Sequence, residues 1–329
     1  MDKIISLIML EISIIVTAYN RTQYLDQALT SLANQSFQKD NFEIIVITNF
    51  QYRFADNNLK IKYIIMEGTI GNYLSTGIKE SNGNIICFLD DDDLFHVDKL
   101  TLLNKLFKDS DAIYFKNGVS KFSQDRKSAN DELIGSVHRI EVKNMKSILN
   151  SSLEFNLSSI SVKRQFIIKY LDKINNIKSA TDTFMFLIFV NEQGIAIMYD
   201  ANLTYYRVHN STSNFMDENP INRNYINWAM DMMNNYNFMY NAFQNEMILR
   251  FIEIRRAVFK ARIFIYNKPT STNFTNNDMI KLFFLAFVYR KFTIYYKMLL
   301  FGVFILKFLP GLFSIFEIIN KKVENLYRF

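Results

Sequence analysis

The sequence predicts an α/β fold built on a mostly parallel, doubly wound sheet. Runs of apolar and β-branched residues alternate with stretches whose apolar residues recur at helical spacing, and Gly or Asn residues separate many of them. Strands that alternate with helices at this pitch form parallel sheets with right-handed crossovers. With 329 residues, of which 49% are apolar, the chain can also build a sizeable core.

The elements follow one another from the first strand, which begins at Glu11 and ends at the turn formers Asn20 and Arg21. The apolar pattern then predicts two helices, residues 23–34 and 73–81, and three further strands, residues 42–48, 61–66 and 85–89. In such a sheet the carboxyl ends of the strands open on one edge, where ligands bind. The ends of the first, second and fourth strands should therefore lie together.

Four consecutive aspartates, Asp90 to Asp93, follow the buried strand 85–89. Carboxylates this dense repel one another unless a cation lies among them, and ligands that are all oxygen suit Mg²⁺ or Mn²⁺. Because alternate residues of a strand point to one side, Asp90 and Asp92 can address one ion, which leaves Asp91 and Asp93 for supporting contacts. The competing interpretation is a solvated acidic turn with Asp93 as the N-cap of a helix that starts near Val97.

Composition excludes several classes of site. The single cysteine, Cys87, lies in an apolar strand and cannot form an intrachain disulfide, and three histidines are too few to favour a zinc site. Residues 281–329 contain eight basic and two acidic residues, a net charge equal to the +6 of the whole chain. The body is therefore close to neutral, which argues against nucleic-acid binding.

Several segments, in order, resemble the inverting family 2 glycosyltransferases of the GT-A fold. They are V-T-A-Y-N-R, I-V-I-T-N, G-N-Y-x-x-x-x-I-K-E-S-N-G, F-L-D-D-D-D-x-F-x-x-D-K-L, S-A-T-D-T-F-M-F-L-I-F-V-N-E-Q-G and Y-Y-R-V-H-N-S-T-S. The resemblance covers about residues 12–213. It implies a GT-A catalytic domain over residues 1–215, with a nucleotide-sugar half over about 1–95 and an acceptor half over about 96–215.

The resemblance also implies roles for residues at the strand ends. Tyr19 would stack on a nucleobase and Arg21 would face phosphate, although both are equally compatible with plain surface roles. Asn49 stands where the family commonly has an aspartate that contacts the base. The residues implied to bind the nucleotide-sugar, a UDP- or GDP-sugar, are Thr17, Ala18, Tyr19, Arg21, Asn49, Asp90 and Asp91.

The catalytic base implied by the resemblance is Asp182, where the family usually has Glu-Asp and this chain has Thr181-Asp182. An ordinary helix cap by either residue is the alternative. Asp92 and Asp90 would ligate Mn²⁺ or Mg²⁺, and His209 is a further candidate ligand, with a structural histidine as the alternative. Arg207 would contact the diphosphate. Residues 150–163 would line the acceptor side, or form a plain edge strand.

Beyond the catalytic domain we expect a helical extension over 216–275 and aromatic, basic, amphipathic helices over 276–329 that associate with a membrane. Residues 298–319 are long enough to span a bilayer, but Lys307 and the Pro310-Gly311 break favour helices that lie in its plane. Their apolar residues could instead form core or a homodimer interface. Membrane attachment predicts a lipid-linked or membrane-assembled glycan acceptor at the cytoplasmic face of the cell membrane.

The sequence thus predicts a metal-dependent inverting glycosyltransferase that moves a sugar from a nucleotide-diphosphate sugar to a hydroxyl acceptor. A sugar-1-phosphate nucleotidyltransferase would need a glycine-rich loop after the first strand, where Ala18-Tyr19-Asn20 stands. A catalytically inactive nucleotide-sugar-binding or membrane-scaffold protein is the other alternative, because Thr181 and Asn49 depart from the family pattern.

Overall fold

The computed structural model describes residues 10–55, 58–123, 131–208, 223–267, 274–288 and 293–309. The chain divides into two compact units. We call Met1–Val142 with Leu153–His209 the sheet unit, and Lys143–Ser152 with Asn210–Phe329 the helical unit.

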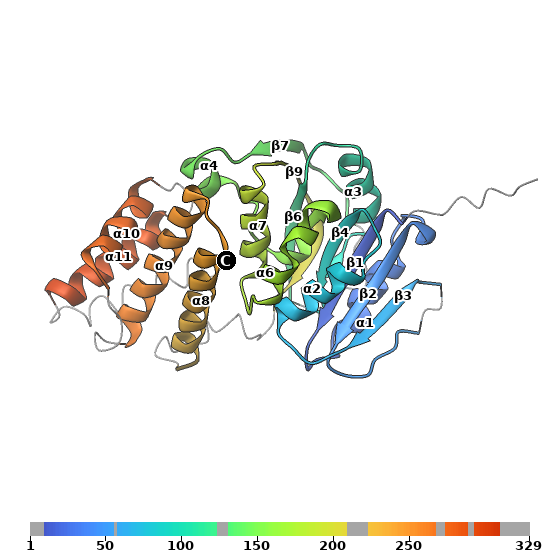
Figure 1. Cartoon of the computed structure of the whole chain (residues 1–329), viewed down its shortest axis with the longest axis horizontal. Helices are drawn as coiled ribbons and strands as arrows, with labels where there is room; N and C mark the ends of the chain where they lie inside the picture. The colour runs from blue at the N-terminus through green and yellow to red at the C-terminus, as the bar shows by residue number, and fades with distance from the viewer. Residues whose placement is uncertain are drawn as a thin grey trace, which may run out of the picture. The chain divides into compact units, whose positions relative to one another are not determined.

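The described elements follow the chain as shown in Figure 1. The strands are β1 (Ile12–Ala18), β2 (Phe42–Thr48), β3 (Ile61–Ile65), β4 (Ile85–Asp90), β5 (Leu94–Phe95), β6 (Tyr114–Phe122), β7 (Val137–Glu141), β8 (Ile160–Lys163) and β9 (Ile195–Arg207). The helices are α1 (Leu25–Ala33), α2 (Ile70–Glu80), α3 (Lys99–Phe107), α4 (Met145–Asn150), α5 (Arg164–Ile167), α6 (Leu171–Asn175), α7 (Thr181–Asn191), α8 (Arg223–Ala242), α9 (Glu246–Asn267), α10 (Asn276–Val288) and α11 (Thr293–Phe308).

All the strands belong to one sheet, in the order β3-β2-β1-β4-β8-β6-β9-β5, with β7 paired to β9. The strands β3, β2, β1 and β4 are parallel, which confirms the predicted parallel sheet for this half. Beyond β4 the sheet is mixed, because β8 runs antiparallel to both β4 and β6 while β6 and β9 are parallel. The register places Thr17 beside Asp90 and Ala18 beside Thr48, so three strands end at the same edge.

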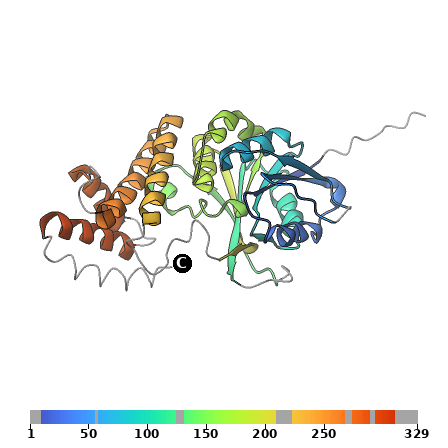
Figure 2. The ribbon, with the colours of Figure 1, turned by 90° about the horizontal axis from the view of Figure 1, so that it is seen from below.

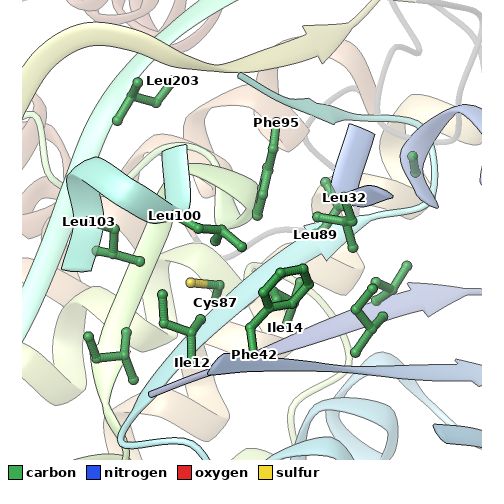
Figure 3. Close-up of a cluster of buried hydrophobic side chains, with 14 of the residues drawn as sticks. Ile12, Ile14, Leu32, Phe42, Cys87, Leu89, Phe95, Leu100, Leu103 and Leu203 are labelled. Atoms are coloured by element: carbon green, nitrogen blue, oxygen red, sulfur yellow. The ribbon is translucent and has the colours of Figure 1, made fainter. Parts of the chain in front are cut away.

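Alternate residues of the buried strands pack on opposite faces of the sheet. On one face Ile12, Ile14 and Val16 of β1 join the apolar sides of α1 and α3, and Cys87 lies in this cluster (Figure 3). On the other face α2 approaches β1 so closely that a Cβ at Gly77 would come within 2.6 Å of the Ile15 side chain. The sheet is therefore a central layer with helices on both sides, as the doubly wound prediction requires.

Some boundaries differ from those expected. Helix α2 begins at Ile70, three residues before the predicted start, because Thr69 and Asn72 form a capping box. Helix α3 begins at Lys99 with Asp98 at the N-cap position, so the interpretation of Asp93 as a helix cap is wrong. The interpretation of 150–163 as an edge strand is also wrong, because β8 is hydrogen-bonded on both sides.

In the helical unit the four long helices α8 to α11 gather in one bundle (Figure 2). Helix α9 packs against α8, α10 and α11, and α10 packs against α11. Trp228 and Tyr236 of α8 both contact the ring of Phe259 on α9. Among the helices described here, none is both long and apolar enough to cross a membrane.

Candidate functional site

The site lies at the edge of the sheet unit where β1, β2 and β4 end. Just beyond β1, Asn20 adopts a left-handed conformation with φ of 53°. Its backbone N–H donates to Oδ1 of Asn49 at 2.9 Å, and Nδ2 of Asn49 donates back to Oδ1 of Asn20 at 2.6 Å. Asparagine tolerates this backbone region better than most residues do. Asn49 therefore fixes the turn after β1 as well as standing at the end of β2.

Arg21 joins this turn to the acidic stretch. Its guanidinium forms two hydrogen bonds with Asp91, Nε to Oδ2 at 2.9 Å and Nη2 to Oδ1 at 2.6 Å, and Nη2 also donates to Oδ2 of Asp92 at 2.6 Å. These bonds with Asp91, and the charges of both carboxylates, raise the pKa of Arg21. The tip of β1 and the tip of β4 are thus held together by a forked ion pair.

Asp90 ends β4 beside Thr17, and its backbone N–H donates to Oγ of Ser158 at 3.0 Å. Burial raises the pKa of Asp90 well above its ordinary value, and the charges of nearby aspartates raise it further. Those neighbours are Asp93, Asp92, Asp91 and Asp182, in decreasing order of effect. Asp182 is distant in the sequence, so the fold brings the predicted base to the acidic stretch.

Asp182 stands in the first turn of α7, after Ala180 in a left-handed conformation with φ of 55°. The N-cap position belongs to Ala180, so neither Thr181 nor Asp182 is the helix cap. One carboxylate oxygen of Asp182 accepts from the backbone N–H of Thr183 at 2.8 Å, and Oγ1 of Thr183 donates to Glu154 at 2.7 Å. Thr183 therefore links two carboxylates on the predicted acceptor side.

Tyr114 of β6 lies near both of these carboxylates. Burial raises the pKa of its phenol well above the ordinary value, and the charges of Asp182 and Glu154 add to the effect. Its hydroxyl donates to the carbonyl of Leu153 at 2.8 Å, and its ring packs 4.9 Å from that of Phe189 on α7. Tyr114 thus holds α7 and the segment that carries Glu154 against the sheet.

Asp93 is fully buried and holds the acidic turn to the rest of the site. Its carboxylate accepts from Nδ2 of Asn156 at 2.7 Å and from the backbone N–H of Arg207 at 3.1 Å. Burial raises the pKa of Asp93 to about 7, and the charge of Asp92 contributes. This agrees with the supporting role expected for the residue.

Arg207 is buried, with 3% of its surface exposed. Its guanidinium lies between the rings of Tyr24 and Phe122, 4.2 Å and 4.4 Å from their centres. Nε donates to the backbone carbonyl of Asp92 at 2.9 Å, and Nη2 donates to Gln27. Arg207 therefore holds the backbone of the acidic turn through its hydrogen bond to Asp92. Its contact with a diphosphate stays a prediction.

Lys99 is a residue of the site that sequence reasoning missed. It is completely buried, and its ammonium group donates to the carbonyl of Ser158 at 2.6 Å and to Oγ1 of Thr204 at 3.0 Å. Burial lowers its pKa to about 7. The sequence around Lys99, an Asp-Lys pair at the start of α3, contains no signal that separates a buried lysine from a solvated one.

Glu154, which accepts a hydrogen bond from Thr183, is a second residue that sequence reasoning missed.

Of the other predicted residues, Tyr19 is 55% exposed and lies edge-on to Tyr73, with 6.2 Å between the ring centres. A solvent-facing ring at the end of β1 is free to receive a nucleobase on one side. Thr17 and Ala18 are buried strand residues at the same edge. His209 lies outside the described residues.

The residues around Asp90 and Asp92 fit a divalent cation of the Mg²⁺ or Mn²⁺ type. Their donors are all carboxylate oxygens, and their mutual repulsion is what such a cation relieves. No group of three or more metal-binding side chains is assembled within the described ranges.

The model of the family described as glycosyl transferase family 2 matches residues 13–171. Residues 13–171, just under half of the chain, are therefore similar to glycosyl transferase family 2. The match covers β1 to β4, the acidic stretch and the segment with Glu154 and Ser158, which confirms the family predicted from the sequence motifs.

Two curated relatives extend this comparison. An uncharacterized glycosyltransferase of Rickettsia bellii is 24% identical over 234 residues, covering 68% of this chain and 33% of that protein. The poly(ribitol-phosphate) beta-N-acetylglucosaminyltransferase TarS of Staphylococcus aureus is 27% identical over 208 residues, covering 58% of this chain and 35% of TarS. The chain therefore spans about a third of the length of these relatives.

The family 2 domain also has a solved structural counterpart. The structure of S. aureus TarS 1-349 in complex with UDP-GlcNAc superposes with a TM-score of 0.51 and 17% identity. The match covers 89% of this chain and 87% of that one. At this identity the match shows the fold, so the GT-A fold predicted from the sequence is confirmed.

Proposed function

We propose that the chain is an inverting, metal-dependent glycosyltransferase that moves a sugar from a nucleotide-diphosphate sugar to a hydroxyl acceptor. The observation that supports the proposal is that the charge of Asp182, a residue distant in the sequence, adds to the effects that raise the pKa of Asp90 at the end of β4. A carboxylate that faces a donor-binding edge from another element is what a base for an incoming hydroxyl requires.

The donor side is formed by the ends of β1, β2 and β4. Tyr19 offers an exposed ring to the base, and Asn20 and Asn49 present amide groups beside it. Thr17, Ala18, Asp90 and Asp91 line the edge along which the ribose and diphosphate would lie. The nucleotide-sugar named in the structure of TarS supports a donor of the UDP-sugar class; a GDP-sugar would use the same edge.

In the reaction the acceptor hydroxyl oxygen bonds to the anomeric carbon on the face opposite the diphosphate. The carbon–oxygen bond to the diphosphate breaks, its electron pair leaves with that group, and the hydroxyl proton passes to Asp182. Asp90 and Asp92, with His209 as a candidate third ligand, would hold a divalent cation, which would supply charge neutralisation for the departing diphosphate. Asp93 and Arg207 hold the turn that carries Asp92 in place.

We also propose that the acceptor is a lipid-linked or membrane-assembled glycan at the cytoplasmic face of the cell membrane. The support is the positive charge of residues 281–329, since anionic lipids of the cytoplasmic leaflet attract basic segments.

The test combines donor binding with turnover. The full chain is screened by thermal shift against UDP- and GDP-sugars with Mn²⁺, and release of nucleoside diphosphate is then measured with the donor that binds. Asp182→Asn should lower turnover by at least about 100-fold and change donor affinity by no more than a few-fold. Asp172→Asn, an exposed aspartate on α6, is the matched control and should retain turnover.

Full turnover in Asp182→Asn removes the assigned base. Donor binding without turnover in the unaltered chain, with membranes supplied as acceptor, would return the protein to the class of inactive nucleotide-sugar-binding proteins.

A further inference from the structure

Helices α10 and α11 of the helical unit carry apolar residues on two faces. One face of each helix is buried: Leu282, Leu285 and Ala286 on α10, and Tyr296, Leu299 and Val303 on α11. This face packs inside the bundle, where α10 and α11 contact each other and α9. A helix with one such stripe is an ordinary surface helix and is expected to be polar on its outer side.

The outer side is instead aromatic. The aromatic ridge consists of Phe283, Phe284 and Phe287 on α10 and Phe301, Phe304 and Phe308 on α11. These six side chains are between 39% and 58% exposed. Within each helix the rings stand next to one another, Phe283 on Phe287 with 4.4 Å between centres and Phe304 on Phe308 with 5.0 Å. Clustered exposed phenylalanines at helical spacing mark a surface that is covered by an apolar partner.

Lysines border the aromatic ridge. Nζ of Lys297 lies 5.3 Å from the centre of the Phe287 ring, and Nζ of Lys307 lies 6.0 Å from that of Phe308. Both lysines are exposed, and Lys307 also donates to Oδ1 of Asn276 at 2.7 Å. Long basic side chains beside an apolar stripe are typical of helices that lie in a membrane interface, where the ring enters the lipid and the ammonium group stays at the headgroups.

We propose that the aromatic ridge is a docking surface for an anionic lipid bilayer, on which α10 and α11 lie in the membrane plane. The net charge of +6 over residues 281–329 complements anionic headgroups. The same charge opposes a second copy of the chain, because face-to-face pairing would bring the lysine borders of two ridges together.

The inference deepens the proposed membrane location and is tested without turnover, so its failure and that of the proposed transferase activity are distinguishable. The full chain is floated on a density gradient with vesicles of phosphatidylglycerol and phosphatidylcholine, and separately with vesicles of phosphatidylcholine alone. We expect binding to the anionic vesicles that weakens as salt rises. Absence of binding to the anionic vesicles overturns the proposal.

The double variants Phe283→Ser/Phe287→Ser and Phe304→Ser/Phe308→Ser should each lower vesicle partitioning by about tenfold or more. Ile134→Ser, at an isoleucine of the sheet unit that is 82% exposed, is the matched control and should bind like the unaltered chain. Lys297→Glu/Lys307→Glu leaves the rings in place and should lower partitioning into anionic vesicles by roughly fivefold or more. The melting temperature of each variant is measured to check that the variant is folded.

Unchanged flotation of the phenylalanine variants overturns the proposal. A second outcome also overturns the proposal. If the unaltered chain does not bind vesicles, and light scattering shows a dimer that becomes a monomer in the phenylalanine variants, the aromatic ridge is a contact between copies of the chain. If a phenylalanine variant does not fold, the lysine variant decides: flotation equal to that of the unaltered chain at low salt counts against a lipid surface.

Discussion

The guanidinium of Arg21 and the carboxylate of Asp91 face each other with two hydrogen bonds, at 2.9 Å and 2.6 Å. The same guanidinium also binds Asp92, which is one of the proposed metal ligands. The positive charge of Arg21 therefore neutralises part of the carboxylate charge that a divalent cation would use. A divalent cation that binds these carboxylates would compete with the guanidinium of Arg21 for them.

This competition predicts the effect of Arg21→Gln on metal binding. Without the guanidinium, the carboxylates of Asp91 and Asp92 lose their internal counter-charge, so Mn²⁺ should bind the nucleotide-free protein roughly three- to tenfold more tightly. Isothermal titration with Mn²⁺ measures the change. Arg21→Lys, which keeps the charge but loses the two-bond geometry, is the comparison and should bind Mn²⁺ with an affinity between those of the unaltered chain and Arg21→Gln. Equal or weaker Mn²⁺ binding in Arg21→Gln would contradict the prediction.

The contact between Thr183 and Glu154 predicts a loss of turnover in Thr183→Val. The valine keeps the shape of the side chain but removes the hydroxyl that donates to Glu154, so the first turn of α7, which carries Asp182, loses its hydrogen bond to the segment that carries Glu154. We expect turnover to fall by roughly 10- to 100-fold with little change in the KM for the donor. Steady-state release of nucleoside diphosphate measures both. Thr181→Val, two residues earlier, should be much milder, and equal losses in the two variants would count against the orienting role.

The buried Lys99 predicts a pH dependence of stability. Burial lowers its pKa from the ordinary 10.5 to about 7 in the folded chain. Between these values the unfolded chain binds the extra proton, so the free energy of unfolding should rise with pH. The contribution approaches about 1.4 kcal/mol for each pH unit. The groups whose charges act on Lys99 are Cys87, Lys116 and Asp93.

The measurement is urea unfolding between pH 7 and pH 9. Lys99→Met should lack this rise in stability, and the carbonyl of Ser158 keeps a hydrogen bond from Thr204 in the variant. Lys105→Met, at an exposed position of the same helix, should keep the rise. Parallel pH profiles for the unaltered chain and Lys99→Met would show that Lys99 is protonated throughout.

Gly71 predicts a stability effect that does not depend on the site. A Cβ at this position would come within 2.3 Å of the carbonyl oxygens of Ile174 and Ile177, so Gly71→Ala must push α2 away from α6. We expect a loss of roughly 2 kcal/mol or more in the free energy of unfolding. Lys79→Ala, on the exposed side of α2, should change it by less than about 0.5 kcal/mol. Urea unfolding compares the two, and similar stabilities would refute the close approach.

The parallel half of the fold could be predicted because its signals are local. Strand β2 has the predicted bounds, Phe42 to Thr48, since an apolar run between polar turns needs no distant partner to be recognised. The position of β8 could not be predicted in this way. Its pairing with β4 and β6 joins residues far apart in the sequence, and the four residues Ile160–Lys163 carry no signal of strand direction.

The candidate site divides along the same line. Asp90 to Asp93 could be found because carboxylates at the end of a buried strand are visible in the sequence. Asp182 was implied by the resemblance to family 2 glycosyltransferases, since its local pattern alone also fits a helix cap. Lys99 and Glu154 act through contacts with Ser158 and Thr183 that only the folded chain creates. The burial of Arg207 between Tyr24 and Phe122 was hidden for the same reason.

The interior position of β8 bears on how a sheet unit of this kind can move. Strand β8 is hydrogen-bonded to β4 on one side and to β6 on the other. The strand that ends in the aspartates and the later strands therefore form one continuous sheet. A continuous sheet of this kind has no hinge between its two halves about which they could rotate. Any closure over a bound nucleotide-sugar must then come from the loops that connect the strands and helices at the edge of the sheet. Substitutions in these loops should change the rate of product release more than the rate of the chemical step.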